Sequence, residues 1–278
     1  MFKGRKLVIA TKHEKEKVIA PILEKELGVI CFLVEDLNTD ILGTFTGEVE
    51  RTDDPIITAR KKCLMAMELS QCDLAVASEG SFGQHPSLSF VPADDEFLLL
   101  IDKKNSLEII ARELSTATNF NGAQINTEEE LNEFATHANF PSHGLILRKS
   151  KDDFKKIVKG ISDESQLKNI FYSLMSSEGS VYIETDMRAM HNPTRMNVIE
   201  AAAFKLANKI NSLCPECQMP GFGITEAKSG LPCKACNYQT SSIISHVYTC
   251  KKCSFIHEKK HPNGKLTEDP MYCDVCNP

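Results

Sequence analysis

The chain lacks a long apolar run. None of its 278 residues belongs to a stretch of about 18 or more apolar residues, the length that suggests a membrane-spanning helix. After Met1–Lys6 the sequence is apolar only over Leu7–Ala10, which is too short for the core of a secretion signal. We therefore expect a protein that neither crosses a membrane nor is secreted, and that works in the cytoplasm, where thiols stay reduced.

The chain also lacks low-complexity tracts, internal repeats of about 20–50 residues and an excess of positive charge. Its composition, 42% hydrophobic and 25% charged, is that of an ordinary globular protein, and its length suits one large domain and a smaller one. The net charge of −6 disfavours non-specific nucleic-acid binding, because such binding draws on Lys and Arg.

Cysteine, by contrast, is abundant near the C-terminus. Four Cys-x-x-Cys pairs follow residue 213, and a pair with this spacing can place both sulfurs on one tetrahedral ion. The pairs are Cys214/Cys217, Cys233/Cys236, Cys250/Cys253 and Cys273/Cys276. A site closed by four cysteines has no open position for water, so we expect two structural Zn²⁺ ions.

These pairs can be combined in two ways. In the sequential combination, the first two pairs share an ion and the last two share another; an interleaved pairing is the alternative, and the sequence does not decide between them. Asn237 and Asn277 follow the second and fourth pairs, where the tight turn of a zinc ribbon favours a residue that tolerates left-handed backbone. The sequence assigns no role to His257 and His261, which are surplus to eight thiolates.

The composition changes abruptly at Leu213, which predicts an α/β domain over residues 1–212 and a zinc-ribbon-like module over residues 213–278. The module contains seven Lys, no Arg and six acidic residues. Each Zn²⁺ with four thiolates adds a charge of about −2, which brings the module to about −3. A ribbon that binds nucleic acid usually has a basic face, so a protein partner is the better expectation for this module, and nucleic acid is less favoured.

Residues 1–212 alternate short apolar runs with segments whose apolar residues recur at helical spacing. The expected strands are Lys6–Ala10, Val29–Val34, Thr44–Glu50, Asp73–Ser78, Glu96–Asp102, Leu107–Leu114, Gly144–Arg148 and Ser180–Thr185. The expected helices are Glu14–Leu27, Pro55–Ser70, Glu128–His137, Asp152–Lys159, Glu164–Ser176 and Pro193–Asn211. This alternation predicts an α/β fold with a mixed central sheet flanked by helices, and ligands of such sheets bind at the carboxyl ends of strands.

One candidate site follows the expected strand Asp73–Ser78, where a loop begins with Glu79 and Gly80. A carboxylate at this edge can hold Mg²⁺, and a glycine lets the backbone approach a phosphate. We expect Glu79 to take part in catalysis, with help from Asp95 or Glu184, and Gly80 to contact the bound group. A polar turn without function is the alternative.

A second candidate site surrounds the start of the last expected helix. Its reactive side chains are Glu184, Asp186, Arg188, His191 and Arg195. Asn192 and Pro193 form a good N-cap and first helical residue, so the helix start would offer N–H groups to an anion. We expect the first four to be catalytic and Arg195 to bind the anion. The alternative is an arginine–carboxylate network that fixes the turn.

A third candidate is the charged segment after the first strand. Lys12 and Lys15 lie at the carboxyl end of that strand, and we expect them to neutralise phosphate charge. An ordinary charged first turn of a helix is the alternative. The role of His143, in a loop with Gly and Pro, stays open.

Part of the chain resembles the inosine/xanthosine triphosphatase branch of the house-cleaning nucleotide pyrophosphatases, a group that includes the Maf-type enzymes. A strand ends at Thr11 and runs into a charged helix, a helix carries Thr58–Lys62, and Leu74–Gly80 forms an acidic strand end. The resemblance covers roughly residues 5–102 and implies that Glu79 binds Mg²⁺ and that basic residues near the first helix contact phosphates. The whole chain is similar to a bacterial family of uncharacterised proteins with the same C-terminal cysteine pattern, which implies no activity.

The sequence therefore favours a metal-dependent phosphohydrolase or pyrophosphatase that acts on a nucleotide or another phosphorylated small molecule and carries a structural zinc module. The alternative is a non-catalytic protein that binds a nucleotide, RNA or a protein and docks through its zinc ribbons. His13 and Glu16 favour this alternative, because the resembled family has Asn and Lys there. Neither the substrate nor the oligomeric state can be read from the sequence.

Overall fold

The computed structural model describes residues 1–35, 37, 39–43 and 53–278. The strand expected over Thr44–Glu50 lies outside these residues. The chain divides into two compact units, Met1–Ala207 and Asn208–Pro278. No helix among the described residues has the length and apolar character needed to cross a membrane.

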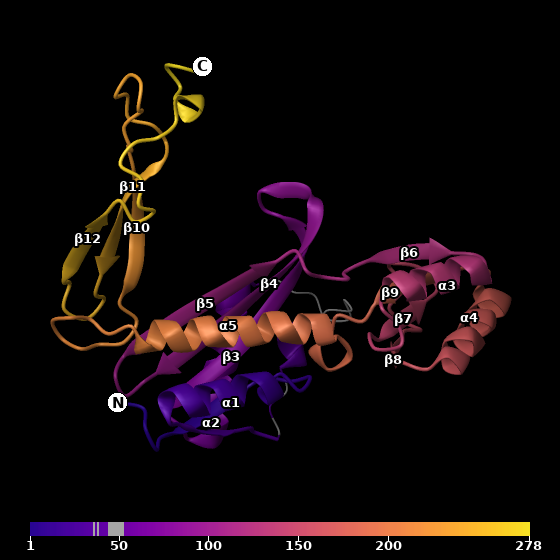
Figure 1. Ribbon diagram of the computed structural model, residues 1–278. Coiled ribbons are helices and arrows are strands. Elements are labelled where there is room, and N and C mark those ends of the chain that lie inside the picture. The colour runs from indigo at the N-terminus through magenta and orange to yellow at the C-terminus, as the bar shows by residue number, and fades with distance from the viewer. Residues whose placement is uncertain (36, 38, 44–52) are drawn as a thin grey trace. The chain divides into compact units, whose positions relative to one another are not determined.

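A five-stranded sheet in the order β2-β1-β3-β4-β5 belongs to the first unit (Figure 1). The strands are β1 (Lys6–Ala10), β2 (Ile30–Phe32), β3 (Leu74–His85), β4 (Leu88–Asp102) and β5 (Leu107–Ser115). β1 runs parallel to β2 and β3, whereas β3, β4 and β5 pair antiparallel. The predicted α/β fold with a mixed sheet and flanking helices is confirmed.

Three long helices accompany this sheet: α1 (Glu16–Leu27), α2 (Pro55–Ser70) and α5 (Pro193–Asn211). α2 begins at an N-cap whose side chain accepts a hydrogen bond from the backbone of Ile56, with a proline at the first helical position. Its buried residues pack on the sheet face that carries Ala75, Ala77 and Leu99. Side chains alternate between the faces of a strand, so the even-numbered residues of β3 and β4 lie on the opposite face.

β3 is longer than the sequence predicts. The expected strand ends at Ser78 and gives way to a loop, but β3 continues to His85 and pairs with β4 along its whole length. Glu79 lies opposite Phe97, and Gly80 lies opposite Glu96. The predicted loop at Glu79 and Gly80 is therefore wrong, because cross-strand pairing, which local composition does not report, holds these residues in the sheet.

A second sheet with the order β6-β9-β7-β8 also belongs to the first unit. Its antiparallel strands are β6 (Gly122–Ile125), β7 (Leu145–Arg148), β8 (Val158–Ile161) and β9 (Val181–Thr185), and two helices, α3 (Glu128–His137) and α4 (Glu164–Glu178), share its core. The helix expected over Asp152–Lys159 is absent, since this segment leads into β8. The strands expected after residue 140 therefore do not belong to the central sheet.

The second unit is built on a three-stranded antiparallel sheet. Its strands are β10 (Gly223–Ser229), β11 (Ile243–Thr249) and β12 (Ile256–Lys260). All five residues of β12 and most of β10 are exposed, so this sheet has little apolar core. A short 3₁₀ helix, η3 (Pro270–Tyr272), precedes the last cysteine pair. Little apolar burial leaves the cysteines as the main candidates for holding this unit together.

Candidate functional site

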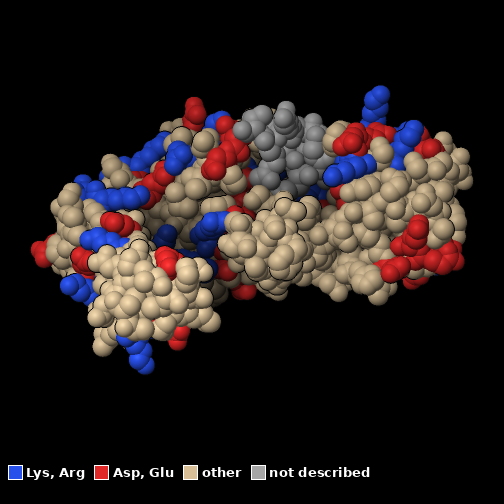
Figure 2. Space-filling model, turned by 90° about the horizontal axis from the view of Figure 1, so that it is seen from above, with Lys and Arg blue, Asp and Glu red and all other residues tan. Residues whose placement is uncertain are grey.

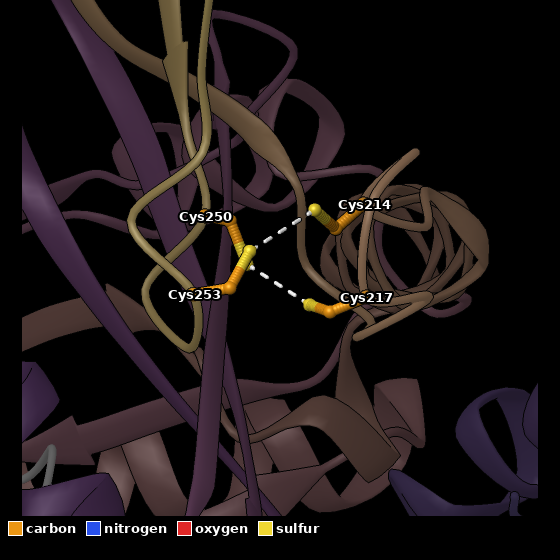
Figure 3. Close-up of side chains that lie close together, drawn as sticks. All are labelled: Cys214, Cys217, Cys250 and Cys253. Atoms are coloured by element: carbon orange, nitrogen blue, oxygen red, sulfur yellow. Dashed lines mark hydrogen bonds between the residues drawn. The ribbon is translucent and has the colours of Figure 1, made fainter.

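The first group of cysteines combines the first and third Cys-x-x-Cys pairs. Cys214, Cys217, Cys250 and Cys253 point their sulfurs at one another (Figure 3). Sγ of Cys214 lies 3.7 Å from Sγ of Cys253, and Sγ of Cys217 lies 3.6 Å from Sγ of Cys250. Zn–S bonds of about 2.3 Å in a tetrahedron place the sulfurs about 3.8 Å apart, so this group fits a Zn²⁺ ion.

The second group combines the other two pairs. Cys233, Cys236, Cys273 and Cys276 form it, with Sγ–Sγ distances of 3.8 Å between Cys233 and Cys276 and 3.6 Å between Cys236 and Cys273. Each group could therefore hold one zinc ion. The pairing is interleaved, which decides between the two combinations that the sequence left open.

Strand pairing explains the interleaving. β10 and β11 are antiparallel, with Gly223 opposite Thr249, so the segment before β10 meets the turn after β11. The first and third cysteine pairs lie in these two segments. At the other end of the sheet, Cys233 forms a parallel bridge with Glu268, which brings the fourth pair to the second.

Each cysteine pair sits in the same kind of turn. The backbone N–H that follows the second cysteine donates to the carbonyl of the first over 2.9 Å at Gln218, Asn237 and Ser254, and over 2.8 Å at Asn277. The first three have positive φ angles of 58°, 58° and 61°. The left-handed backbone predicted for Asn237 is confirmed, whereas Asn277 does not adopt it.

The two histidines of this unit stand apart from the cysteine groups. Nδ1 of His261 interacts with the carbonyl of Lys265 over 2.9 Å, and the ring of His257 packs near Tyr248. Neither belongs to a group that could hold a metal ion among the described residues. Four thiolates therefore form each site, which leaves no position open for substrate.

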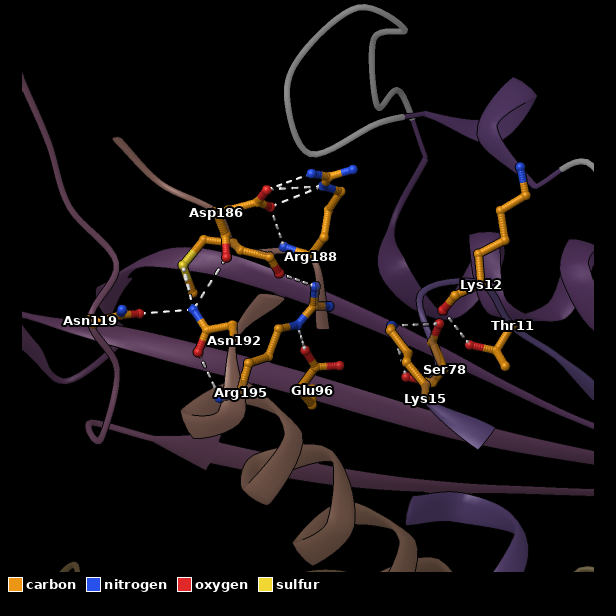
Figure 4. Close-up of polar contacts among 11 residues, drawn as sticks. Thr11, Lys12, Lys15, Ser78, Glu96, Asn119, Asp186, Arg188, Asn192 and Arg195 are labelled. Atoms are coloured by element: carbon orange, nitrogen blue, oxygen red, sulfur yellow. Dashed lines mark hydrogen bonds and ion pairs between the residues drawn. The ribbon is translucent and has the colours of Figure 1, made fainter. Parts of the chain in front are cut away.

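In the first unit, a buried lysine lies at the carboxyl end of β1. The turn before α1 holds His13 and Glu14 at φ angles of 65° and 62°, which non-glycine residues rarely adopt. This turn places Lys15 in the interior, where its ammonium donates to Oγ of Ser78 over 3.1 Å (Figure 4). Burial, and secondly the positive charge of Arg195, lower the pKa of Lys15 to about 8. The side chain of Lys12 points away from this contact.

A buried arginine lies on the same face of the sheet. Nε of Arg195, in the first turn of α5, donates to Oε1 of Glu96 over 2.6 Å, and neither side chain is exposed to solvent. The guanidinium also donates to the carbonyl of Met187 and lies 5.0 Å from the ring centre of Phe82. A Cβ atom at Gly80 would collide with the Glu96 carboxylate, so glycine at this position leaves room for the ion pair.

Two residues before Glu96, on the same face of β4, lies Asp94. This carboxyl group is fully buried, and among the described residues no N–H or O–H group donates to it; the side chain within hydrogen-bonding reach is the carboxyl group of Glu96. Burial, and secondly the charge of Glu96, raise the pKa of Asp94. Asp95, the predicted helper of Glu79, lies on the other face, where its carboxylate pairs with Arg112 over 2.7 Å.

These residues form a buried charge cluster. It lies beyond the carboxyl end of β1, next to the part of β3 that follows its pairing with β1. Its members are Lys15, Ser78, Asp94, Glu96 and Arg195. Of these, the sequence singled out Lys15 and Arg195 and missed the rest. The alternation of Asp94 and Glu96 inside an otherwise apolar strand is the signal that could have identified them, because both then face one side.

Glu79 lies on the opposite face from this cluster, where its carboxylate forms an ion pair with Lys62 of α2. The basic residues before it in α2 have other partners: Arg60 pairs with Glu108 and Lys61 with Asp53. Glu79 is thus buried near the end of β1 but is engaged by a lysine.

The structure does not bring Glu184 to the central sheet. Glu184 lies on β9 in the second sheet, where it accepts a hydrogen bond from Arg148 over 2.8 Å. Asp186 is fully buried and accepts from the backbone N–H of Gly160 and from the backbone and side chain of Arg188. These contacts match the alternative of a turn-fixing network, and the nearby carbonyl of Met187 links the turn to Arg195.

The remaining predicted residues also support this turn. His191 ends the 3₁₀ helix η2 (Ala189–His191), and its side chain packs so closely against Gly144 and Gly160 that a Cβ atom at either glycine would lie 2.9 Å from it. Its backbone carbonyl accepts from Gly144 over 2.8 Å.

The start of α5 is already satisfied by protein groups. Oδ1 of Asn192 accepts from the backbone N–H of Arg195 over 3.0 Å, which confirms the predicted N-cap. The N–H of Thr194 points to Nε2 of His143, which also contacts the Thr194 hydroxyl over 2.8 Å. Pro193 has no N–H, so the amides at this helix start are engaged by Asn192 and by His143, which serves as a second cap.

Comparison with known proteins gives one family. A family model described as a domain of unknown function, DUF6671, matches residues 62–278. No curated protein matches the chain. The match contains Asp94, Glu96, Arg195 and both cysteine groups, and it starts after Lys15. The comparisons give no support to the resemblance to nucleotide pyrophosphatases.

Proposed function

The chain belongs to the DUF6671 family, and we propose that it is a metal-dependent phosphohydrolase that acts on a nucleotide or another phosphorylated small molecule. The buried ammonium of Lys15 carries this proposal. Burying a charged group is unfavourable unless hydrogen bonds and opposite charges offset the loss of water, and among the described residues the hydrogen bonds of Lys15 go to Ser78 alone. Glu96 and Glu79 act on its charge from nearby, whereas burial and Arg195 oppose the charge and lower its pKa. A phosphate oxygen would add a hydrogen-bond acceptor and further negative charge.

The position of Lys15 supports the same function. Ligands of α/β sheets bind beyond the carboxyl ends of parallel strands, and Lys15 lies at that end of β1, beside Ser78 of β3. Arg195 adds a second buried positive charge on the same face and holds Glu96 in place. Glu79 holds Lys62 at the same end of the sheet.

In the proposed reaction, water attacks phosphorus, a new P–O bond forms and the bond to the leaving oxygen breaks. The proton of the water passes to solvent or to the released phosphate. Lys15 binds the phosphate oxygens and Arg195 holds Glu96 in place. A divalent cation bound beside the phosphate would supply Lewis-acid stabilisation of the negative charge on the phosphate oxygens.

The two cysteine groups complete the proposal as structural zinc sites. Each group is closed by four thiolates, so zinc would stabilise the second unit without taking part in the reaction. Mixed surface charge agrees with a minor role for nucleic acid: Figure 2 shows Lys and Arg interspersed with Asp and Glu over the described part of the face in view.

Zinc-loaded protein incubated with a panel of nucleoside phosphates and Mg²⁺ tests the proposal. We expect release of phosphate or pyrophosphate from at least one substrate, and a loss of roughly 100-fold or more in rate for Lys15→Met. Lys12→Met is the matched control and should keep the wild-type rate. Absence of turnover across the panel, or equal rates for both variants, contradicts the proposal.

A non-catalytic binding protein is the second candidate. Its support is that three carboxylates predicted to be catalytic are engaged by basic side chains: Glu79, Glu184 and Asp186. The zinc module also exposes apolar side chains, among them Leu266 and Tyr272, which a protein partner could cover. RNA binding measured at about 50 and 200 mM salt tests whether this candidate binds RNA. Binding through phosphate contacts should weaken steeply as the salt concentration rises.

A further inference from the structure

The least satisfied group in the buried charge cluster is the carboxyl of Asp94. It has no solvent exposure, no N–H or O–H group of the described residues donates to either oxygen, and the side chain within hydrogen-bonding reach is the carboxyl group of Glu96. The neighbouring Glu96 differs, because its carboxylate receives Arg195. A buried carboxylate that lacks a partner is neutralised either by a proton or by a cation.

The surroundings favour a cation. Asp94 and Glu96 are two residues apart on one strand, so both carboxyl groups lie on the same face, across from Phe82 and Gly80 of β3. Two carboxylates completed by waters and substrate phosphate are a usual ligand set for Mg²⁺. We propose that Asp94 and Glu96 hold a hard divalent cation, Mg²⁺ or Mn²⁺, beside the phosphate site at Lys15.

The positive neighbours determine when this cation binds. Lys15 and Arg195 both act electrostatically on Asp94 and oppose a cation placed next to it. A phosphate bound at Lys15 offsets their charge and offers oxygens to the same ion. Cation and phosphate should therefore strengthen each other's binding by the same factor. The inference rests on the proposed function for the phosphate, whereas the cation site can be measured alone.

Mn²⁺ binding to the zinc-loaded full-length protein tests the inference, with electron paramagnetic resonance as readout. We expect one Mn²⁺ site that Mg²⁺ competes for. Asp94→Asn should weaken the site by more than the roughly tenfold that loss of an outer-shell partner costs. Inorganic pyrophosphate should tighten Mn²⁺ binding to the wild-type protein.

Asp95→Asn is the matched control, since it removes the same group from the adjacent residue on the opposite face. Its Mn²⁺ affinity should equal that of the wild type. Thermal unfolding of Asp94→Asn checks that this variant is folded, which the loss of an unpartnered buried carboxyl should not prevent.

Equal Mn²⁺ affinity in the wild type and Asp94→Asn, or no Mn²⁺ binding to the wild type, overturns the inference. Hydrolysis that does not depend on Asp94 would overturn the cation site and keep the proposed function. Mn²⁺ binding lost in Asp94→Asn, in a protein that hydrolyses nothing, would support the cation site and contradict the proposed function.

Discussion

At the scale of single residues, Gly80 shows how closely the buried charge cluster is packed. A Cβ atom there would collide with the Glu96 carboxylate and lie 2.8 Å from Nη2 of Arg195, and both groups are buried. We expect Gly80→Ala to destabilise the fold by about 1–3 kcal/mol, as overpacking does. Urea denaturation measures the change.

Gly83→Ala is the control for this prediction. Gly83 lies on the same strand, and a Cβ atom there meets nothing within 4 Å. Its effect should stay within about 0.5 kcal/mol. Similar destabilisation by both substitutions would show that loss of glycine from β3, and not crowding of the ion pair, is responsible.

Lys15 gives a second prediction at this scale, on pH. Its pKa is about 8 in the folded protein, against 10.5 for an unperturbed lysine. Between these values the unfolded chain binds more protons, so the free energy of unfolding should rise with pH from about 8 to about 10.5. The rise is on the order of 3 kcal/mol, at about 1.4 kcal/mol per pKa unit.

Lys15→Met should lack this rise, whereas Lys12→Met should keep it. The measurement is chemical denaturation of the wild type and both variants at pH 7, 8.5 and 10. The free energy of unfolding of each variant is subtracted from that of the wild type at the same pH, so that the contributions of other titrating groups cancel. Parallel pH curves for wild type and Lys15→Met would contradict a charged, buried Lys15.

At the scale of elements, helices were the most predictable part of the molecule. α2, α3 and α5 have the bounds predicted from the sequence, because their starts carry local signals: an Asp54 N-cap, a Thr127–Glu130 capping box and an Asn192 N-cap. β3 was predicted too short, because its second half is held by partners on β4 that are distant in sequence.

The cysteine pairing could not be decided from the sequence for a similar reason. The spacing of the Cys-x-x-Cys pairs reports that metal is bound, whereas the register of β10 against β11 decides which pairs meet. Ligand types could thus be read from the sequence, but their combination could not.

Paired substitutions test the interleaved arrangement. Cys217→Ala with Cys253→Ala removes two ligands from one group and should leave one intact four-cysteine site, with one tightly bound metal. Cys217→Ala with Cys236→Ala damages both groups and should leave none. Cadmium-113 NMR of the substituted proteins reports the number of intact four-cysteine sites. No intact site in the first double variant and one in the second would show sequential pairing.

At the scale of the whole molecule, the two units depend on different forces. Unit Met1–Ala207 has apolar clusters at both of its described sheets, whereas the β10 and β12 strands of unit Asn208–Pro278 are mostly exposed. The division into an α/β part and a cysteine-rich part could be predicted from composition. The second sheet could not, because β6 and β8 are four-residue strands without clear alternation.

Removal of metal should therefore act on one unit alone. We expect a strong chelator to abolish protection of backbone amides from hydrogen exchange in β10 and β11 and to leave protection in β3 and β4 unchanged, since metal binding supplies folding free energy where the core is small. Re-addition of Zn²⁺ should restore it. Protection of β10 and β11 that survives complete metal removal would contradict a structural role for zinc.

The central claim is that the buried charge cluster binds phosphate together with a divalent cation. Isothermal titration of zinc-loaded protein with inorganic pyrophosphate, with and without Mg²⁺, tests it most directly. We predict binding that Mg²⁺ strengthens, that Lys15→Met abolishes and that Lys12→Met preserves. Absence of binding under all conditions, or equal binding to wild type and Lys15→Met, would contradict the claim.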